Sequence, residues 1–302
     1  MLKLRKISPY FWYSLLAISY LTLSMTLPVS QQTLDSIHIN LFQYHVLAFS
    51  ILVPYCLIWL AAFYAYVHMQ GYAKLLGSAP EAPAFAHIGK GLKIMAWGLA
   101  VPAIISVILR SLTVEHTNLI ATAAIINNYI ALLVPLLAFT IIGNGSSILS
   151  KLTKTKLGPL TIRLFALVFI TFSVLYTWLT LQEYRVDNNP YYLSLPMIIL
   201  TLIIPYLYAW FLGLFASLQM AGYAQRVKGL LYKRALNLVA IGIVTVIASS
   251  TLIQYFMIIF AGQKDLTAAS VELMLYIFLI LEAIGFVSIS DGAKRLKRIE
   301  EI

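Results

Sequence analysis

Long apolar runs separated by short basic segments dominate the chain. A helix that crosses the hydrocarbon core of a bilayer needs about 20 predominantly apolar residues. Eight runs approach or exceed this length, so the pattern predicts eight membrane-spanning helices. Their approximate ranges are 11–28, 42–67, 94–109, 119–142, 164–182, 192–218, 236–261 and 270–290. The third run is short, but Lys93 and Arg110 at its two ends have side chains long enough to reach the interfaces.

Basic residues gather in the segments between alternate pairs of runs. If the N-terminus lies in the cytoplasm, 18 of the 21 Lys and Arg residues are cytoplasmic, and only Arg110, Arg185 and Lys264 lie outside. Such an excess of basic residues is typical of cytoplasmic loops. We therefore expect a multi-pass protein of the cell (plasma or inner) membrane with both termini in the cytoplasm. Its cytoplasmic basic loops should contact anionic lipid headgroups, and the longest of these loops is 74–93.

The second and sixth runs share an unusual set of residues. Residues 54–73 read PYCLIWLAAFYAYVHMQGYA and residues 205–224 read PYLYAWFLGLFASLQMAGYA, with eight of twenty positions identical at an offset of 151. The ends of the fourth and eighth runs match at an offset of 147, and we attribute the difference to a longer loop after the second run. Each copy holds an even number of spans, so both cross the bilayer in the same sense. The predicted fold is an all-α polytopic bundle of two tandem parallel four-helix repeats, 1–150 and 151–302.

Two prolines occupy the same place in the two matched helices. Proline inside a helix removes a backbone hydrogen bond and bends the helix, so we expect kinks at Pro54 and Pro205. The kinks flank a pocket, act as hinges or are permanent features of shape, and the last interpretation is the simplest. Tyr55 and Tyr206, next to the prolines, are candidates for lining a polar pathway. Both helices end in Met-x-Gly-Tyr-Ala, which we interpret as termination at the glycine and headgroup anchoring by the tyrosine.

Glu282 is the one acidic residue well inside an apolar run, LYIFLILEAIGFVSI. Ionisable groups inside a bilayer are costly and by default indicate a functional site. No basic residue lies at this depth, so we expect a neutral acid at rest. Its candidate hydrogen-bond partners at similar depth are Trp59, Trp210, Tyr208 and Thr245. Glu282 is either a proton or cation relay or a hydrogen-bonded structural acid, and its counterpart in the first repeat is Pro135.

Asn127 and Asn128 lie near the middle of the fourth run and either line a polar pathway or bond between helices, which is the commoner use. Other chemistry is not indicated. The spans hold no pair of histidines at matched depth for haem and no lysine for a retinal Schiff base. Cys56 is the only cysteine, and the chain has no Walker, GxSxG or HExxH motif. No metal or cofactor site is expected.

Composition narrows the function classes. Only 11% of the residues are charged, against about 25% in soluble domains. The net charge of +10 does not indicate nucleic-acid binding, because the basic residues are spread over short clusters between apolar runs. The leading hypothesis is a channel or transporter for a small solute or ion. The alternative is a non-catalytic membrane scaffold, sensor module or accessory subunit with an unknown protein partner. A lipid-active membrane enzyme ranks third, because acidic and histidine residues do not cluster at one interface.

Overall fold

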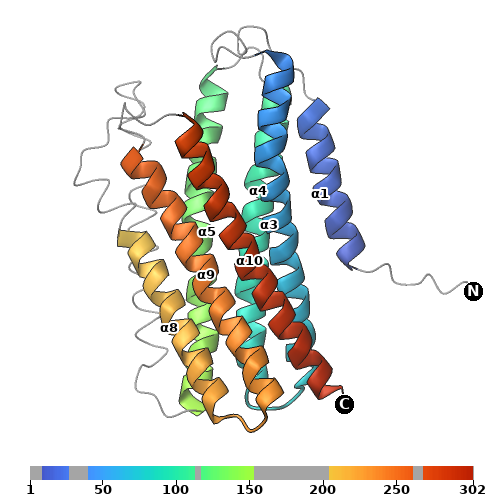
Figure 1. Cartoon of the computed structure of the whole chain (residues 1–302), viewed down its shortest axis with the longest axis vertical. Helices are drawn as coiled ribbons and strands as arrows, with labels where there is room; N and C mark the ends of the chain where they lie inside the picture. The colour runs from blue at the N-terminus through green and yellow to red at the C-terminus, as the bar shows by residue number, and fades with distance from the viewer. Residues whose placement is uncertain (1–8, 27–39, 113–116, 153–203, 261–267, 302) are drawn as a thin grey trace, which may run out of the picture.

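The described part of the chain is a bundle of long α-helices (Figure 1). The computed structural model describes residues 9–26, 40–112, 117–152, 204–260 and 268–301. The helices are α1 (Pro9–Thr26), α3 (Leu41–Leu75), α4 (Ala82–Leu112), α5 (Thr117–Leu152), α8 (Ile204–Arg226), α9 (Leu230–Phe260) and α10 (Ala268–Glu300). Each of these elements is an α-helix, which confirms the all-α prediction for this part of the chain.

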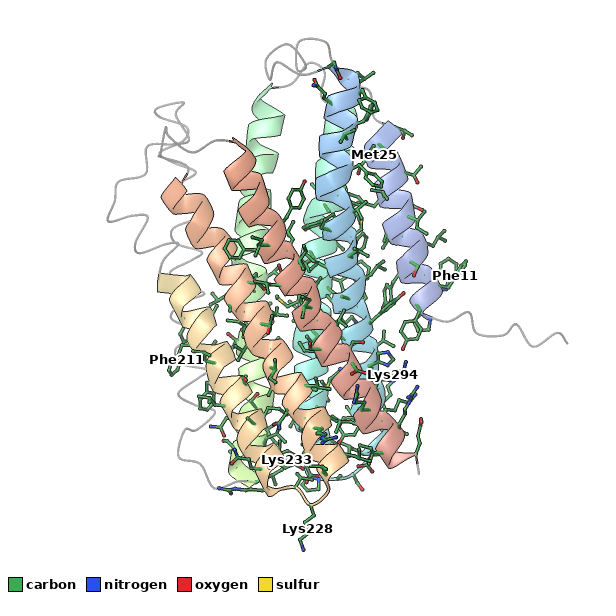
Figure 2. All side chains as sticks on the ribbon, in the orientation of Figure 1. Phe11, Met25, Phe211, Lys228, Lys233 and Lys294 are labelled. Atoms are coloured by element: carbon green, nitrogen blue, oxygen red, sulfur yellow. The ribbon has the colours of Figure 1, made fainter. Side chains whose placement is uncertain are left out.

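Four of the described helices are long and apolar enough to cross a bilayer. The qualifying segments are Leu52–Leu75, Ala82–Ile105, Leu230–Ser250 and Tyr276–Glu300. Large apolar side chains also face outwards: Phe11 and Phe211 point away from the bundle in Figure 2 and are 53% and 57% exposed. These features indicate a membrane protein. The expected fifth span, 164–182, and the first part of the sixth lie outside the described residues.

Six of the described helices form a closed ring. α3 contacts α4, α4 contacts α5, α5 contacts α8, α8 contacts α9, α9 contacts α10, and α10 returns to α3. α1 lies outside the ring, against α3 and α4. One continuous core of buried apolar side chains joins these helices. Its largest fully buried members include Trp59, Phe63, Tyr72, Phe85 and Phe286.

Glycine lets two antiparallel helix pairs approach closely. A Cβ atom added at Gly145 of α5 would lie 2.6 Å from the carbonyl oxygen of Ala84 on α4. A Cβ atom added at Gly292 of α10 would lie 2.7 Å from the carbonyl oxygen of Ala235 on α9. Small residues at membrane helix interfaces permit this kind of backbone approach. The α4–α5 and α9–α10 pairs are therefore closely packed units.

The helix ends differ from the prediction because helices continue past the apolar runs. The segment 74–93, expected as a loop, is helical from Ala82 onwards. The chain turns instead at Gly77 (φ +56°) and at Gly229 (φ +116°), where a left-handed backbone suits glycine. Gly71 and Gly222 lie inside α3 and α8, so the interpretation of Met-x-Gly-Tyr-Ala as a helix terminator is wrong. A glycine commonly ends a helix when it adopts a left-handed backbone conformation. Gly71 and Gly222 do not adopt one, and the helical hydrogen bonding continues past them.

Described basic residues gather at one end of the bundle, which we call the basic end. α3, α5, α8 and α10 end there, whereas α4 and α9 begin there (Figure 1). Figure 2 shows Lys228 and Lys233 at this end, with Lys294 nearby. The last helical turns of α3, α5, α8 and α10 contribute Lys74, Lys151, Arg226, Lys297 and Arg298.

Candidate functional site

Glu282 lies on α10 and is buried, with 5% of its surface exposed. α10 packs between α9 and α3, and the carboxyl group is within electrostatic range of Tyr55 on α3. The Tyr55 hydroxyl donates a hydrogen bond to the carbonyl oxygen of Leu99 on α4, at 2.6 Å. Tyr20 of α1 lies within electrostatic range of Tyr55 as well. The structure therefore brings two of the predicted site residues, Glu282 and Tyr55, into one polar cluster.

Trp59 extends this cluster by one helical turn along α3, because it lies four residues after Tyr55. Its indole ring is fully buried and packs edge-on against Tyr20, with the ring centroids 6.1 Å apart. The indole N–H is buried and has no hydrogen-bond partner among the described residues. An unpaired buried donor costs about 1–3 kcal/mol. This N–H is therefore a donor available to an acceptor that enters the cluster.

The predicted partners of Glu282 need correction. The expected hydrogen bond from Trp59 is wrong, since the indole N–H bonds to no described group. Thr245 uses its hydroxyl proton on the carbonyl oxygen of Ile241 in its own helix, at 2.9 Å. Equal depth in the membrane does not ensure contact, because two side chains at one depth can point to different sides of their helices. Tyr208 is buried, while the side chain of Trp210 lies outside what the structure describes.

Four other predicted site residues lie on described helices but cannot be assigned contacts. Asn127 and Asn128 lie on α5, and Pro205 and Tyr206 lie at the described start of α8, with their side chains outside the described set. Pro54 lies inside α3, which continues on both sides of it. The pathway and kink roles of these residues remain predictions.

Two tyrosines of the repeated Met-x-Gly-Tyr-Ala element, Tyr72 and Tyr223, connect separate helices near the basic end. The hydroxyl groups of Tyr72 on α3 and Tyr232 on α9 form a hydrogen bond. The Tyr223 hydroxyl on α8 donates to Glu81 Oε1, which lies just before α4, at 3.1 Å. Burial, and after it the Glu81 carboxylate, raises the pKa of Tyr223, so this hydroxyl stays a donor. Tyr72 is fully buried, so the headgroup-anchor interpretation is wrong for it, whereas for the half-buried Tyr223 it stays a prediction.

Two described cavities lie along α3 and α4, and Glu282 lines neither of them. Neither of these two cavities therefore opens onto the Glu282 cluster. The described polar groups of this cluster are the Glu282 carboxyl group, the hydroxyl groups of Tyr55 and Tyr20, and the Trp59 indole N–H, which lacks a hydrogen-bond partner. No protein-family model, curated protein or solved structure matches the chain.

Proposed function

We propose that the chain is a multi-pass membrane channel or transporter for a small solute or ion. In this proposal the repeats 1–150 and 151–302 form two halves, and Glu282 lies in a seam between them. The observation that carries the proposal is the buried carboxyl group of Glu282 on α10, a helix that packs against α3, within electrostatic range of Tyr55. Ionisable residues inside membrane helices mark ion, proton or substrate pathways.

Reciprocal tyrosine contacts support the two repeats. At the offset of 151, Tyr72 corresponds to Tyr223 and Glu81 corresponds to Tyr232. Tyr72 bonds to Tyr232, and Tyr223 bonds to Glu81, so each contact is the counterpart of the other. A two-fold axis along the membrane normal produces such self-complementary pairs of contacts.

Glycine contacts support the same arrangement. Gly145 approaches Ala84 and Gly292 approaches Ala235, with 292 − 145 = 147 and 235 − 84 = 151. The offset of 151 thus extends from α3 and α8 to α4 and α9. The four-residue difference (151 − 147) then falls between the third and fourth helices of a repeat, not in the loop after the second span.

The halves in this proposal meet at two seams, α3–α10 and α5–α8. Within each half, the α4–α5 and α9–α10 pairs are closely packed at glycine. Relative movement is therefore easier at the seams than inside the halves, as in rocking of one repeat against the other. Glu282 lies on α10 at one seam, and its counterpart Pro135 lies on α5 at the other. A single seam thus carries the ionisable group.

Flux measurements on liposomes that contain the full chain test the proposal. Proton and monovalent-cation fluxes are compared for the wild type, Glu282→Gln and the matched control Glu301→Gln, which removes an exposed carboxyl group next to the end of α10. We expect Glu282→Gln to reduce flux to the level of empty liposomes, whereas Glu301→Gln retains it. Equal flux through wild type and Glu282→Gln would remove Glu282 from the pathway.

The second candidate is a membrane scaffold, sensor module or accessory subunit. The packing of the core favours it, because Glu282 lines neither described cavity and the core holds large, fully buried side chains such as Trp59 and Phe286. In that case Glu282 is a structural acid. Absence of flux for every ion through correctly folded wild-type protein, combined with a stable partner purified from its membranes, would favour this candidate over transport.

A further inference from the structure

A groove of about 720 Å³ runs along α4 between α3 and α5. Polar and charged groups line one end of it, and apolar side chains line the other. The polar end holds Gln70, Lys90 and Lys93, and the apolar end holds Trp97, Val101 and Val134. The groove therefore changes from basic to apolar along the helix axis.

The length of the groove matches one leaflet of a bilayer. Lys90 and Val101 are eleven residues apart on α4, which corresponds to about 16 Å along the helix axis. The hydrocarbon core of a bilayer is about 30 Å thick, so one leaflet measures about 15 Å. The lysines lie on the side of the basic end, because α4 begins there (Figure 1). With the lysines at the interface, the groove would extend towards the middle of the membrane.

The charge at the polar end has no acidic counterpart among the described residues that line the groove. Lys90 and Lys93 are both exposed. The ammonium group of Lys93 lies 5.8 Å from the ring centroid of Tyr66, a cation–π contact between two side chains that line the groove. Gln70 is fixed by a hydrogen bond from its side-chain nitrogen to the Ala86 carbonyl oxygen at 3.0 Å. A ligand that fits needs a negative head and an apolar tail.

We propose that this groove binds one anionic phospholipid. Lys90 and Lys93 hold its phosphate, and one acyl chain lies along Trp97 and Val101. Basic pockets between membrane helices are known to bind anionic headgroups. The positions that correspond to the two lysines at the offset of 151 are Ile241 and Val244, so only the first half has this site. The site does not depend on the transport proposal, since Glu282 does not line the groove.

Lipid titration of the purified full-length protein in detergent tests the site. Dioleoyl-phosphatidylglycerol and dioleoyl-phosphatidylcholine have the same chains and differ in headgroup charge, and native mass spectrometry counts the bound molecules. We expect Lys90→Gln/Lys93→Gln to weaken phosphatidylglycerol binding about 30-fold, which corresponds to ~1 kcal/mol for each lysine. The control Lys228→Gln/Lys294→Gln removes two exposed lysines outside the groove and should bind as the wild type does. Lys90→Arg/Lys93→Arg should keep the preference for phosphatidylglycerol.

A soluble competitor separates a lipid from a free phosphate compound. Glycerol 3-phosphate carries the charge without the chains, so it should not displace phosphatidylglycerol. Displacement by glycerol 3-phosphate, equal binding of the two lipids, or an equal loss in the control variant would each overturn the proposal. Unfolding midpoints of all variants show whether a loss of binding reflects the groove or a misfolded protein. If the glutamine variant unfolds, the arginine variant tests the proposal, and loss of its preference for phosphatidylglycerol would overturn it.

Discussion

Gly292 is the position where one added methyl group tests how closely α9 and α10 pack. A Cβ atom there would lie 2.7 Å from the Ala235 carbonyl oxygen and 3.1 Å from the Val239 backbone nitrogen. Unstrained contacts between non-bonded heavy atoms are about 3.5–4.0 Å long. A side-chain carbon, Val239 Cγ2, would lie 2.8 Å away as well, but the other two obstructing atoms belong to the backbone, so rotation of the Val239 side chain does not relieve the clash. The two helices must separate, and Gly292→Ala is therefore expected to destabilise the bundle.

The magnitude follows from two opposed terms. Overpacking a well-packed core costs about 1–3 kcal/mol, and the neighbours Ala293 and Leu296 are fully buried, so we expect the upper end of that range. Replacing glycine by alanine inside a helix stabilises the helix by about 1 kcal/mol, because alanine has the higher helix propensity. The net loss for Gly292→Ala is then about 2 kcal/mol. Gly222→Ala has no atom within 4 Å of its new Cβ and should gain up to about 1 kcal/mol.

Unfolding by increasing mole fraction of sodium dodecyl sulfate in mixed micelles measures both variants. Cys56 is a buried free thiol, so a thiol-reactive fluorogenic dye reports its exposure as the bundle opens. We expect the free energies of unfolding of the two variants to differ by about 3 kcal/mol, with Gly145→Ala close to Gly292→Ala. Equal midpoints for Gly292→Ala and Gly222→Ala would refute the close approach of α9 and α10. A large effect at Gly292 with none at Gly145 would refute the equivalence of the two helix pairs.

Two further predictions concern the tyrosine hydrogen bonds between the proposed halves and the number of spans. Tyr72→Phe and Tyr223→Phe should each lower the free energy of unfolding by about 0.5–1.5 kcal/mol in the same measurement, because each variant loses one hydrogen bond but keeps its ring. An unchanged free energy of unfolding in both variants would show that these hydrogen bonds do not hold the proposed halves together. In a Cys56→Ala background, a cysteine at position 228 should react with a membrane-impermeant reagent only from the cytoplasmic side, and one at position 264 only from the outside. Labelling of both from one side would contradict the predicted orientation and the eight spans.

The apolar runs predicted where the described helices lie but not where they end. The third run begins at 94, whereas α4 begins at Ala82. Hydropathy reports which residues tolerate lipid, while helix ends are set by backbone hydrogen bonding and by turn residues. Residues such as Lys90 and Lys93 continue the helix because their backbone groups bond as any others do. The turn between α3 and α4 is made at Gly77, which has a positive φ. The sequence has several glycines in this stretch, so it does not show which of them makes the turn.

The candidate site was predictable only in part. Glu282 could be found because an acidic residue inside an apolar run is rare and costly. The partner of Tyr72 could not be found, since Tyr232 lies 160 residues away and an interfacial tyrosine also suits a headgroup anchor. The groove had a usable signal, because Lys90, Lys93, Trp97 and Val101 recur at helical spacing on one face of α4. The residues of α3 and α5 that also line the groove could be identified only from the structure.

The positions that are identical in the two proposed repeats differ in kind from those that have diverged, and this difference bears on the function of the protein. The positions that match between the proposed repeats are packing and tie positions, such as Gly145 with Gly292 and Tyr72 with Tyr223. Each copy needs these to hold its own helices, so duplication alone explains why both have them. The counterpart of Glu282 in the other proposed repeat is Pro135, which is not acidic. A buried carboxyl group lowers stability, so packing alone gives no reason to place one there, whereas the proposed pathway at the α3–α10 seam supplies one.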